Sequence, residues 1–385
     1  MLQDSSLRSE WQGRRSPRFK EVLRLKRILS LLLCGTLCAG LLCGCASVFD
    51  RGYYSVTPHQ EQSASDEDAS ILRAENYTDL VSCVQHFVSM GQASGTVHVY
   101  KYPGDITADL KRACSEVRTE DPLGAYALNS VDYSCNRIVS YYECTFNFLY
   151  RRTPEQIAAI TTAYGTATIR DLLQDKLSSF ATSLTIRTSD YYADRASLYT
   201  LVQEAYYADP LTAQDYPRVT VAIYPDSGDV RIVEFNFTYS WPETTMVSRM
   251  NATMAAAGEL AGRDTGATAT VAWLLYSRLL ENTVYREDGS ASVYGALCLG
   301  SANSEGLALG YALLCQQAGI SCTLVKGTLG DTPHCWNQLT LDGETYFLDL
   351  THSDPEESFL LSAEELLAAG YQWSDAPETT AAEAE

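Results

Sequence analysis

EGLALGYALLCQQAGI (residues 305–320) and TPHCWNQLTLDGETYFLDLTHSDP (residues 332–355) are the stretches that decide the fold of the C-terminal third of this 385-residue chain. Glycine is typical of the position just after a helix, so Gly319 predicts a helix from about Glu305 to Ala318. In the second stretch, Asp342-Gly343 lies between two alternating runs, which predicts a β-hairpin with a two-residue turn.

This turn fixes the register of the predicted hairpin. Pairing across it places Asp349 opposite Trp336, and His334 is the next residue on the same face of its strand. His334 and Asp349 are therefore expected to be diagonal neighbours within reach of a hydrogen bond. A histidine that is oriented by an aspartate makes up two thirds of a nucleophilic triad.

Five segments of this region resemble the bacterial transglutaminase-like domain of the papain-like superfamily. They are YGAL, GLALGYALLCQQAGI, HCWN, LDGETYFLDLTHSDP and FLLSAEE. The resemblance covers about residues 265–372 and implies a helix bundle packed on an antiparallel sheet. It also implies a Cys-His-Asp triad that attacks amide carbonyls, in which His334 and Asp349 hold the last two positions.

The same resemblance puts the nucleophile two residues before Gly310-Tyr311-Ala312, where this chain has Ala308. A methyl group forms no acyl-enzyme. Three residues are candidate substitutes: Ser304, for which helix N-capping is the ordinary role, Cys335 and Cys298. Cys335 follows His334 on a strand and is expected on the opposite face, whereas Cys298 lies ten residues before Ala308.

Two functions from different classes follow. The first is a catalytically inactive transglutaminase-like module that binds peptide, protein or cell-wall material, with His334 and Asp349 as remnants of the triad. The alternative is an active cysteine amidase or cross-linking transglutaminase that uses a relocated thiol such as Cys298. Neither function requires a metal or another cofactor, and among the eight cysteines after Cys45 no pair has the CxxC spacing of many zinc sites.

The middle of the chain contains a duplication. Asp121-Pro122-Leu123 recurs 88 residues later at Asp209, and Phe146-Asn147-Phe148 recurs 89 residues later at Phe235. Each copy predicts a strand, a helix and two further strands around a turn, at Ser134–Arg137 in the first copy and Asp226–Asp229 in the second. We therefore expect two tandem α+β repeats, 76–160 and 161–248, before a transglutaminase-like domain at 249–372. The predicted fold class of the whole is α+β.

The N-terminus predicts export. A basic segment precedes fifteen uncharged, mostly apolar residues (28–42, ILSLLLCGTLCAGLL), which fits a secretory signal better than a membrane span. Leu42-Cys43-Gly44-Cys45 resembles a bacterial lipobox, which implies lipidation of Cys45 and a membrane anchor on the extracytoplasmic side. An uncleaved anchor and ordinary secretion are the alternatives. Residues 46–75 are predicted to be a flexible tether and 373–385 a disordered tail.

Charge and cysteine content narrow the possible partners. The chain has 28 basic and 48 acidic residues, a formal charge of −20, and such an acidic surface argues against nucleic acid as a partner. Cys135 and Cys144 lie in neighbouring strand-like runs, where they either form a disulfide or remain buried thiols.

Overall fold

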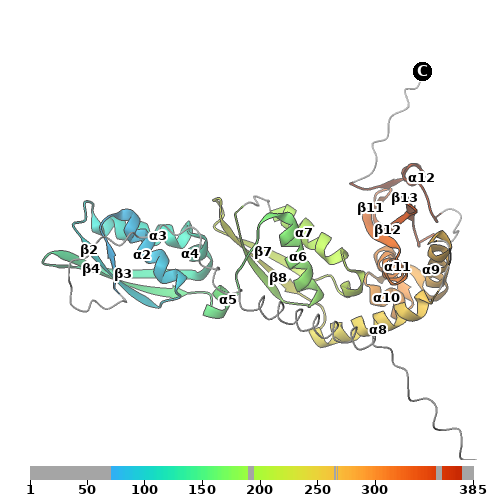
Figure 1. The fold of residues 1–385 in the computed structure, drawn as a ribbon, viewed down its shortest axis with the longest axis horizontal. Coiled ribbons are helices and arrows are strands. Elements are labelled where there is room, and N and C mark those ends of the chain that lie inside the picture. Colours follow the sequence, from blue (N-terminus) through green and yellow to red (C-terminus); the bar gives the residue numbers. More distant parts are fainter. Residues whose placement is uncertain (1–70, 190–194, 264–265, 267, 353–357, 375–385) are drawn as a thin grey trace, which may run out of the picture. The chain divides into compact units, whose positions relative to one another are not determined.

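The computed structural model of the chain describes residues 71–189, 195–263, 266, 268–352 and 358–374. Its helices and strands form an α+β fold, as the sequence predicts (Figure 1). Cys45, the signal segment, residues 46–70 of the predicted tether and residues 375–385 lie outside the described residues. Within these ranges, no helix combines the length and the apolar character needed to cross a membrane.

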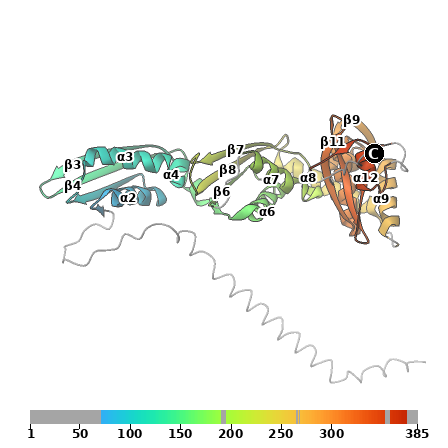
Figure 2. The ribbon, with the colours of Figure 1, turned by 90° about the horizontal axis from the view of Figure 1, so that it is seen from above.

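The first repeat is a four-stranded sheet with helices on one face. The sheet order is β1 (Ile71–Ala74), β2 (Ser94–Tyr100), β4 (Tyr141–Tyr150) and β3 (Leu128–Ile138). Only the β1–β2 pair is parallel among the pairs of this sheet. Helices α2 (Tyr77–Ser89), α3 (Ile106–Thr119) and α4 (Pro122–Ala127) pack on the alternating buried residues of β4, and α2 and α3 run along the sheet in Figure 2.

The second repeat has the same topology. After α5 (Pro154–Ala158), its sheet order is β5 (Thr161–Thr162), β6 (Ser183–Thr188), β8 (Arg231–Thr238) and β7 (Arg218–Tyr224). Helices α6 (Gly165–Ser178) and α7 (Arg195–Tyr207) and the short helix η1 (Pro210–Thr212) correspond to α2, α3 and α4. The two tandem α+β repeats predicted from the sequence are therefore confirmed.

The repeated tripeptides have the same structural role in both copies. Asp121 and Asp209 cap the short helices, with Asp121 Oδ1 accepting from the Gly124 amide at 2.7 Å and Asp209 Oδ1 from the Leu211 amide at 3.1 Å. Proline follows at the first helical position, where its missing N–H costs no hydrogen bond. Phe146 and Phe235 are fully buried on the central strands. The duplication thus preserves a cap and a core position.

Four details differ from the sequence-based expectations. Residues 71–74, expected in the tether, form β1, and the turn expected at Ser134–Arg137 lies inside β3. The domain boundary expected at 248 falls inside α8 (Glu243–Ala261), because loss of strand alternation marks the end of β8 and not a break between packed units. Trp373, expected in the tail, packs against Trp336 with ring centroids 5.7 Å apart.

Cys135 and Cys144 form a disulfide. They are directly opposite each other on β3 and β4, so the bond joins the two strands on either side of their hairpin turn. Of the two possibilities that the sequence left open, the structure contains the disulfide.

The C-terminal domain places helices against an antiparallel sheet. After α8 come α9 (Thr268–Asn282), β9 (Val284–Ser290), α10 (Val293–Cys298), β10 (Ser301–Ala302) and α11 (Ser304–Ala318). The sheet follows, with β11 (Ser321–Leu329), β12 (Thr332–Leu341), β13 (Glu344–Leu348) and β14 (Tyr371–Gln372), and helix α12 (Ala363–Ala368) precedes β14. The strand order in the sheet is β13-β12-β11-β14. This arrangement matches the predicted helix bundle on an antiparallel sheet.

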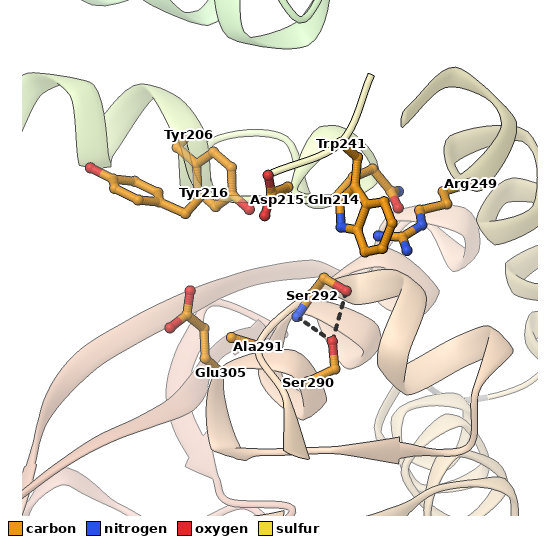
Figure 3. Close-up of a pocket in the computed structure, with 10 residues that line it drawn as sticks. All are labelled: Tyr206, Gln214, Asp215, Tyr216, Trp241, Arg249, Ser290, Ala291, Ser292 and Glu305. Carbon is orange, nitrogen blue, oxygen red and sulfur yellow. Dashed lines mark hydrogen bonds between the residues drawn. The ribbon is translucent and has the colours of Figure 1, made fainter. Parts of the chain in front are cut away.

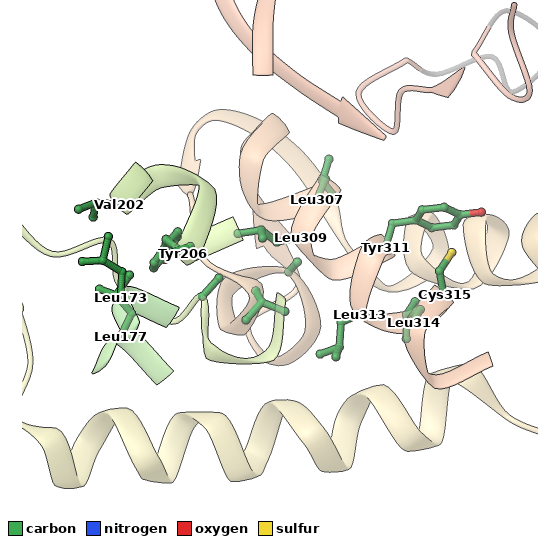
Figure 4. Close-up of a cluster of buried hydrophobic side chains, with 14 of the residues drawn as sticks. Leu173, Leu177, Val202, Tyr206, Leu307, Leu309, Tyr311, Leu313, Leu314 and Cys315 are labelled. Atoms are coloured by element: carbon green, nitrogen blue, oxygen red, sulfur yellow. The ribbon is translucent and has the colours of Figure 1, made fainter. Parts of the chain in front are cut away.

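The second repeat and the C-terminal domain share one hydrophobic core. Leu173, Val202 and Tyr206 of the second repeat belong to the same cluster as Leu307 and Leu309 of α11 (Figure 4). The first repeat has a core of its own, which Ile232 of the second repeat joins. The second repeat is therefore packed as a part of the C-terminal unit, and not as an independent module.

Helix α11 is buried along most of its length, with every residue from Gly306 to Cys315 inside the protein. A helix that is apolar on all sides must be covered on all sides. Near its start the backbone approaches the β9–α10 connection so closely that a methyl group at Gly306 would collide with the carbonyl oxygen of Ser290. Glycine at this position thus allows α11 to seat against β9 and β10.

We therefore expect Gly306→Ala to destabilise the protein by about 1–3 kcal/mol, because a backbone oxygen is the obstacle and yields little. The matched control is Gly258→Ala in α8, where an added methyl meets nothing within 4 Å and alanine favours the helix. Urea unfolding monitored by tryptophan fluorescence measures both. Equal stability of the two variants would contradict the close approach at Gly306.

Candidate functional site

The start of α11 is fixed by a capping side chain. Asn303 Oδ1 accepts a hydrogen bond from the Gly306 amide at 3.0 Å, and at the other end Gly319 adopts a left-handed conformation with φ of 72°. The helix thus spans Ser304–Ala318, in agreement with the predicted range. The role expected for Ser304 is different, because Asn303 and not Ser304 provides the cap. Ser304 is the first helical residue and its hydroxyl is available for another contact.

The β12–β13 hairpin brings the predicted pair together. Asp342 and Gly343 both have positive φ, 53° and 89°, as a two-residue turn of this type requires. Leu341 pairs with Glu344 and Asn337 with Leu348, so Asp349 follows directly after the last pair. This is the register expected from the sequence.

His334 and Asp349 form a buried hydrogen bond of 2.7 Å between Nε2 and Oδ2. Asp349 is 1% exposed and His334 is 8% exposed. Tyr371 donates to the same carboxylate oxygen at 2.6 Å, and the Thr351 amide donates to Oδ1 at 2.8 Å. The carboxylate therefore has partners on both oxygens, as a buried charge requires.

These contacts set the charge of the site. Burial alone would raise the pKa of Asp349, but the hydrogen bonds from His334, Tyr371 and the Thr351 amide hold it below the ordinary value of 3.8. An ionised carboxylate can only accept, so Nε2 of His334 carries the proton in its bond to Asp349. Burial, followed by the charge of Asp349, raises the pKa of Tyr371, so its hydroxyl remains a donor.

Two members of this cluster were not anticipated from the sequence. Tyr371 comes from β14, and His352 Nε2 lies 2.8 Å from the Tyr371 hydroxyl. Tyr371 is one of 25 tyrosines, and nothing in its neighbourhood along the chain signals a role. Only the pairing of β14 with the edge of β11 brings it to Asp349. In the described part of the chain, no group of His, Cys, Asp or Glu side chains is arranged to hold a metal ion.

Ser304 lies beside the histidine. Its Oγ accepts a hydrogen bond from the Cys335 amide at 3.3 Å, and this amide belongs to the peptide group that joins Cys335 to His334. Nδ1 is the ring nitrogen of His334 that lies nearer to that backbone. The first residue of α11 thus packs against the backbone of β12 next to His334, and the group that it contributes there is a hydroxyl.

Ala308 lies one turn further along the helix than Ser304. It is 1% exposed, and its carbonyl oxygen accepts a hydrogen bond from Asn337 Nδ2 at 2.9 Å. The sequence-based assignment of Ala308 as the position of the missing nucleophile thus places that position inside the helix. The assignment of Ala308 as the nucleophile position stays a prediction.

The candidate thiols have environments that disfavour thiolate. Burial, then the charge of Glu305, raises the pKa of Cys335 to about 12. Burial also raises the pKa of Cys298, which is hydrogen-bonded to Thr253 of α8. Cys298 ends α10 and therefore lies against the α8 side of the domain. The structure does not bring it to His334.

Comparisons with known proteins give distant structural likenesses. No protein-family model matches the sequence, and no curated protein is similar to it. Three solved structures are similar to parts of the chain: a TGase (9% identity, TM-score 0.26, 44% of this chain and 51% of that one), a proposed cysteine protease from Cytophaga hutchinsonii (10%, 0.24, 37% and 64%) and a proposed protease from Parabacteroides distasonis (9%, 0.22, 59% and 52%).

These neighbours have transglutaminase-like and cysteine-protease folds, and this chain spans about half to two thirds of their lengths. Because these TM-scores are low, the similarity carries no argument about the chemistry of the site, which is argued from the geometry of this chain alone.

Replacement of Asp349 tests the electrostatics of this cluster. We expect Asp349→Asn to destabilise the protein by about 2–3 kcal/mol at pH 7, because three hydrogen bonds to an ionised oxygen pair are weakened. The pKa of Asp349 is lower in the folded state than its ordinary 3.8, so this stabilisation is complete well above pH 3.8 and disappears as pH falls through the folded pKa.

The difference between wild type and Asp349→Asn should therefore shrink below about pH 4, as measured by urea unfolding from pH 3 to 7. Asp331→Asn, in the exposed β11–β12 turn, is the control and should behave like wild type throughout. A stability difference that stays constant down to pH 3 would argue against an ionised, hydrogen-bonded Asp349.

Proposed function

We propose that this protein is an exported, membrane-tethered transglutaminase-like protein that binds peptide or cell-wall material and performs no thiol chemistry. One observation carries the proposal. The His334–Asp349 hydrogen bond is intact, but the position that the resemblance implies for the nucleophile holds Ala308, and the side chain that α11 places against the Cys335 amide is Ser304 and not a cysteine.

The state of the thiols supports the absence of thiol chemistry. A cysteine nucleophile reacts as the thiolate, which requires a lowered pKa. Among the three candidate substitutes, Cys335 has a pKa raised to about 12 and Cys298 has a raised pKa and lies against α8. The alternative of a relocated thiol at Cys298 therefore has no support from the geometry.

The groups at the start of α11 suit a peptide ligand. The first amides of a helix have no partner within the helix, and here Asn303 occupies the amide of Gly306. The Ser304 hydroxyl and His334 Nδ1 add a donor and an acceptor. A peptide bond offers one acceptor and one donor, which these groups complement.

One specific observation favours a second candidate function. Ser304, His334 and Asp349 are the residue types of a serine hydrolase triad, and Asp349 orients the ring so that Nδ1 is the base. In the described chain, however, the Ser304 hydroxyl is hydrogen-bonded to the Cys335 amide and not to His334. A hydroxyl needs its proton removed by a base in direct contact, so we place binding first and hydrolysis by Ser304 second.

Export is supported by the Cys135–Cys144 disulfide, since such bonds form and persist in oxidising compartments. The anchor itself is proposed from the lipobox at Leu42–Cys45. More than one acyl chain is needed for stable anchoring, and lipidation of an N-terminal cysteine provides this.

The anchor can be tested by detergent partitioning in a bacterial host. We expect the wild-type protein in the detergent phase and Cys45→Ser in the aqueous phase or unprocessed, because the acylated residue is lost. Cys43→Ser is the matched control and should partition like wild type. Identical processing and partitioning of Cys45→Ser and wild type would contradict the lipoprotein proposal.

The nucleophile position can be tested with introduced thiols. We expect Ser304→Cys to be alkylated by iodoacetamide at pH 7 at least tenfold faster than Ala308→Cys. The first thiol lies at a helix start beside His334, which lowers its pKa below the ordinary value of about 8.5, whereas the second is buried. Adding His334→Ala should remove the advantage. Peptide mass mapping measures each site against the native cysteines. Faster alkylation of Ala308→Cys than of Ser304→Cys would support position 308 as the nucleophile position.

A fluorophosphonate probe on the wild-type protein separates the two candidate functions. Binding without catalysis predicts no covalent labelling. Labelling that Ser304→Ala and His334→Ala both abolish would replace the first function by the second.

A further inference from the structure

A pocket of about 160 Å³ opens between the second repeat and the C-terminal domain (Figure 3). It is near the start of α11 but contains neither Ser304 nor His334 in its wall. Its lining comprises residues of the second repeat, of α8 with the segment before it, and of the β9–α10 and α11 region: Tyr206, Gln214, Asp215, Tyr216, Trp241, Arg249, Ser290, Ala291, Ser292 and Glu305.

One side of the pocket carries a positive charge. The Arg249 guanidinium lies over the Trp241 ring at 4.2 Å and over the Tyr294 ring at 5.1 Å, so both rings hold it in place. In the described ranges, no carboxylate forms an ion pair with it. The paired hydroxyls of Ser290 and Ser292 line the same pocket. A held guanidinium without an anionic partner, next to hydroxyl groups, suits a carboxylate.

The opposite side carries two negative charges. Glu305 and Asp215 line the pocket together with Tyr206, and burial, followed by the charges of these two carboxylates, raises the pKa of Tyr206. Figure 3 shows Glu305 on the tyrosine side of the pocket, away from Arg249, and Asp215 between Tyr216 and Trp241. Glu305 Oε1 accepts from the Tyr207 hydroxyl at 2.7 Å, and Asp215 Oδ2 from the Ser240 amide at 2.6 Å. Carboxylates beside aromatic rings suit an ammonium group.

A buried acceptor in the wall has no donor. Gln214 is 1% exposed, and its Nε2 donates to the Leu211 carbonyl and the Thr253 hydroxyl. Its Oε1 has no hydrogen-bond partner. Buried amide oxygens are normally paired, so this unpaired acceptor, itself shielded from the pocket, is an exception in a residue of the wall.

We propose that this pocket binds the zwitterionic group of an α-amino acid, with the carboxylate at Arg249 and the ammonium at Glu305 and Asp215. The size agrees, since a cavity of about 150 Å³ holds a molecule of about six heavy atoms, as alanine has. The proposal goes beyond the function proposed above, because it involves neither Ser304 nor His334. The group belongs either to a free amino acid or to a residue attached to a peptide through its side chain.

The test is a titration of the full chain in detergent micelles, followed by saturation-transfer NMR of the ligand. The probes are alanine, N-acetylalanine, which lacks the ammonium, and alaninamide, which lacks the carboxylate. We expect alanine to bind in the millimolar range and each blocked probe to bind at least tenfold more weakly. Nε-acetyllysine adds a side-chain amide to the same zwitterion. If Nε-acetyllysine binds more tightly than alanine, the ligand is an amino acid attached to a peptide through its side chain. If the two bind equally, the ligand is a free amino acid.

Two variants assign the ends of the ligand. Arg249→Gln should weaken the binding of alanine at least tenfold, and this variant should bind alanine and alaninamide with equal affinity. Glu305→Gln should bind alanine and N-acetylalanine with equal affinity. The controls are Arg263→Gln and Glu259→Gln, both exposed and outside the pocket, which should bind as wild type. A thermal melt of each variant confirms that it is folded. The proposal is overturned if alanine does not bind the wild type, if the blocked probes bind equally well, or if the controls lose as much affinity as the pocket variants.

Discussion

The burial of α11 on all sides is the constraint on which the rest of the structure depends. Four leucines of this helix are fully buried, and each contributes about 2 kcal/mol when removed from water. To bury these leucines, α11 must pack against β11 and β12, against α8 and α9, and against the second repeat. Because packing fixes the helix along its length, its first residue is fixed too. Ser304 is held against the Cys335 amide, which follows His334 on β12.

The buried His334–Asp349 pair is stable as a structural arrangement. An ionised carboxylate in the interior is costly unless hydrogen bonds satisfy it, and Asp349 has His334, Tyr371 and the Thr351 amide as donors. Removal of any of these donors would leave the buried charge with fewer partners. The hydrogen bonds therefore stabilise the cluster independently of any nucleophile. The same contacts that join β12, the segment after β13 and β14 also orient the His334 ring.

The two repeats share one topology and have different surroundings. The first keeps a separate core and a disulfide between β3 and β4, whereas the helices of the second pack on α11. This difference creates the pocket between Arg249 and Glu305, since one wall comes from the second repeat and the other from the C-terminal domain. Duplication thus supplied a module, and packing of one copy on a neighbouring domain supplied a site that neither part has alone.

The sequence alone determined what depends on local chemistry and short spacing. Gly319 ended α11, Asp342-Gly343 set the hairpin register that joins His334 to Asp349, and the repeated tripeptides revealed the duplication. Local patterns did not show that Asn303 rather than Ser304 caps α11, or that α8 crosses the expected boundary. Tyr371 and the pocket of Arg249 and Glu305 join residues far apart in the chain, and only the packing of whole elements decides such contacts, because no spacing along the chain encodes the distance between separate surfaces.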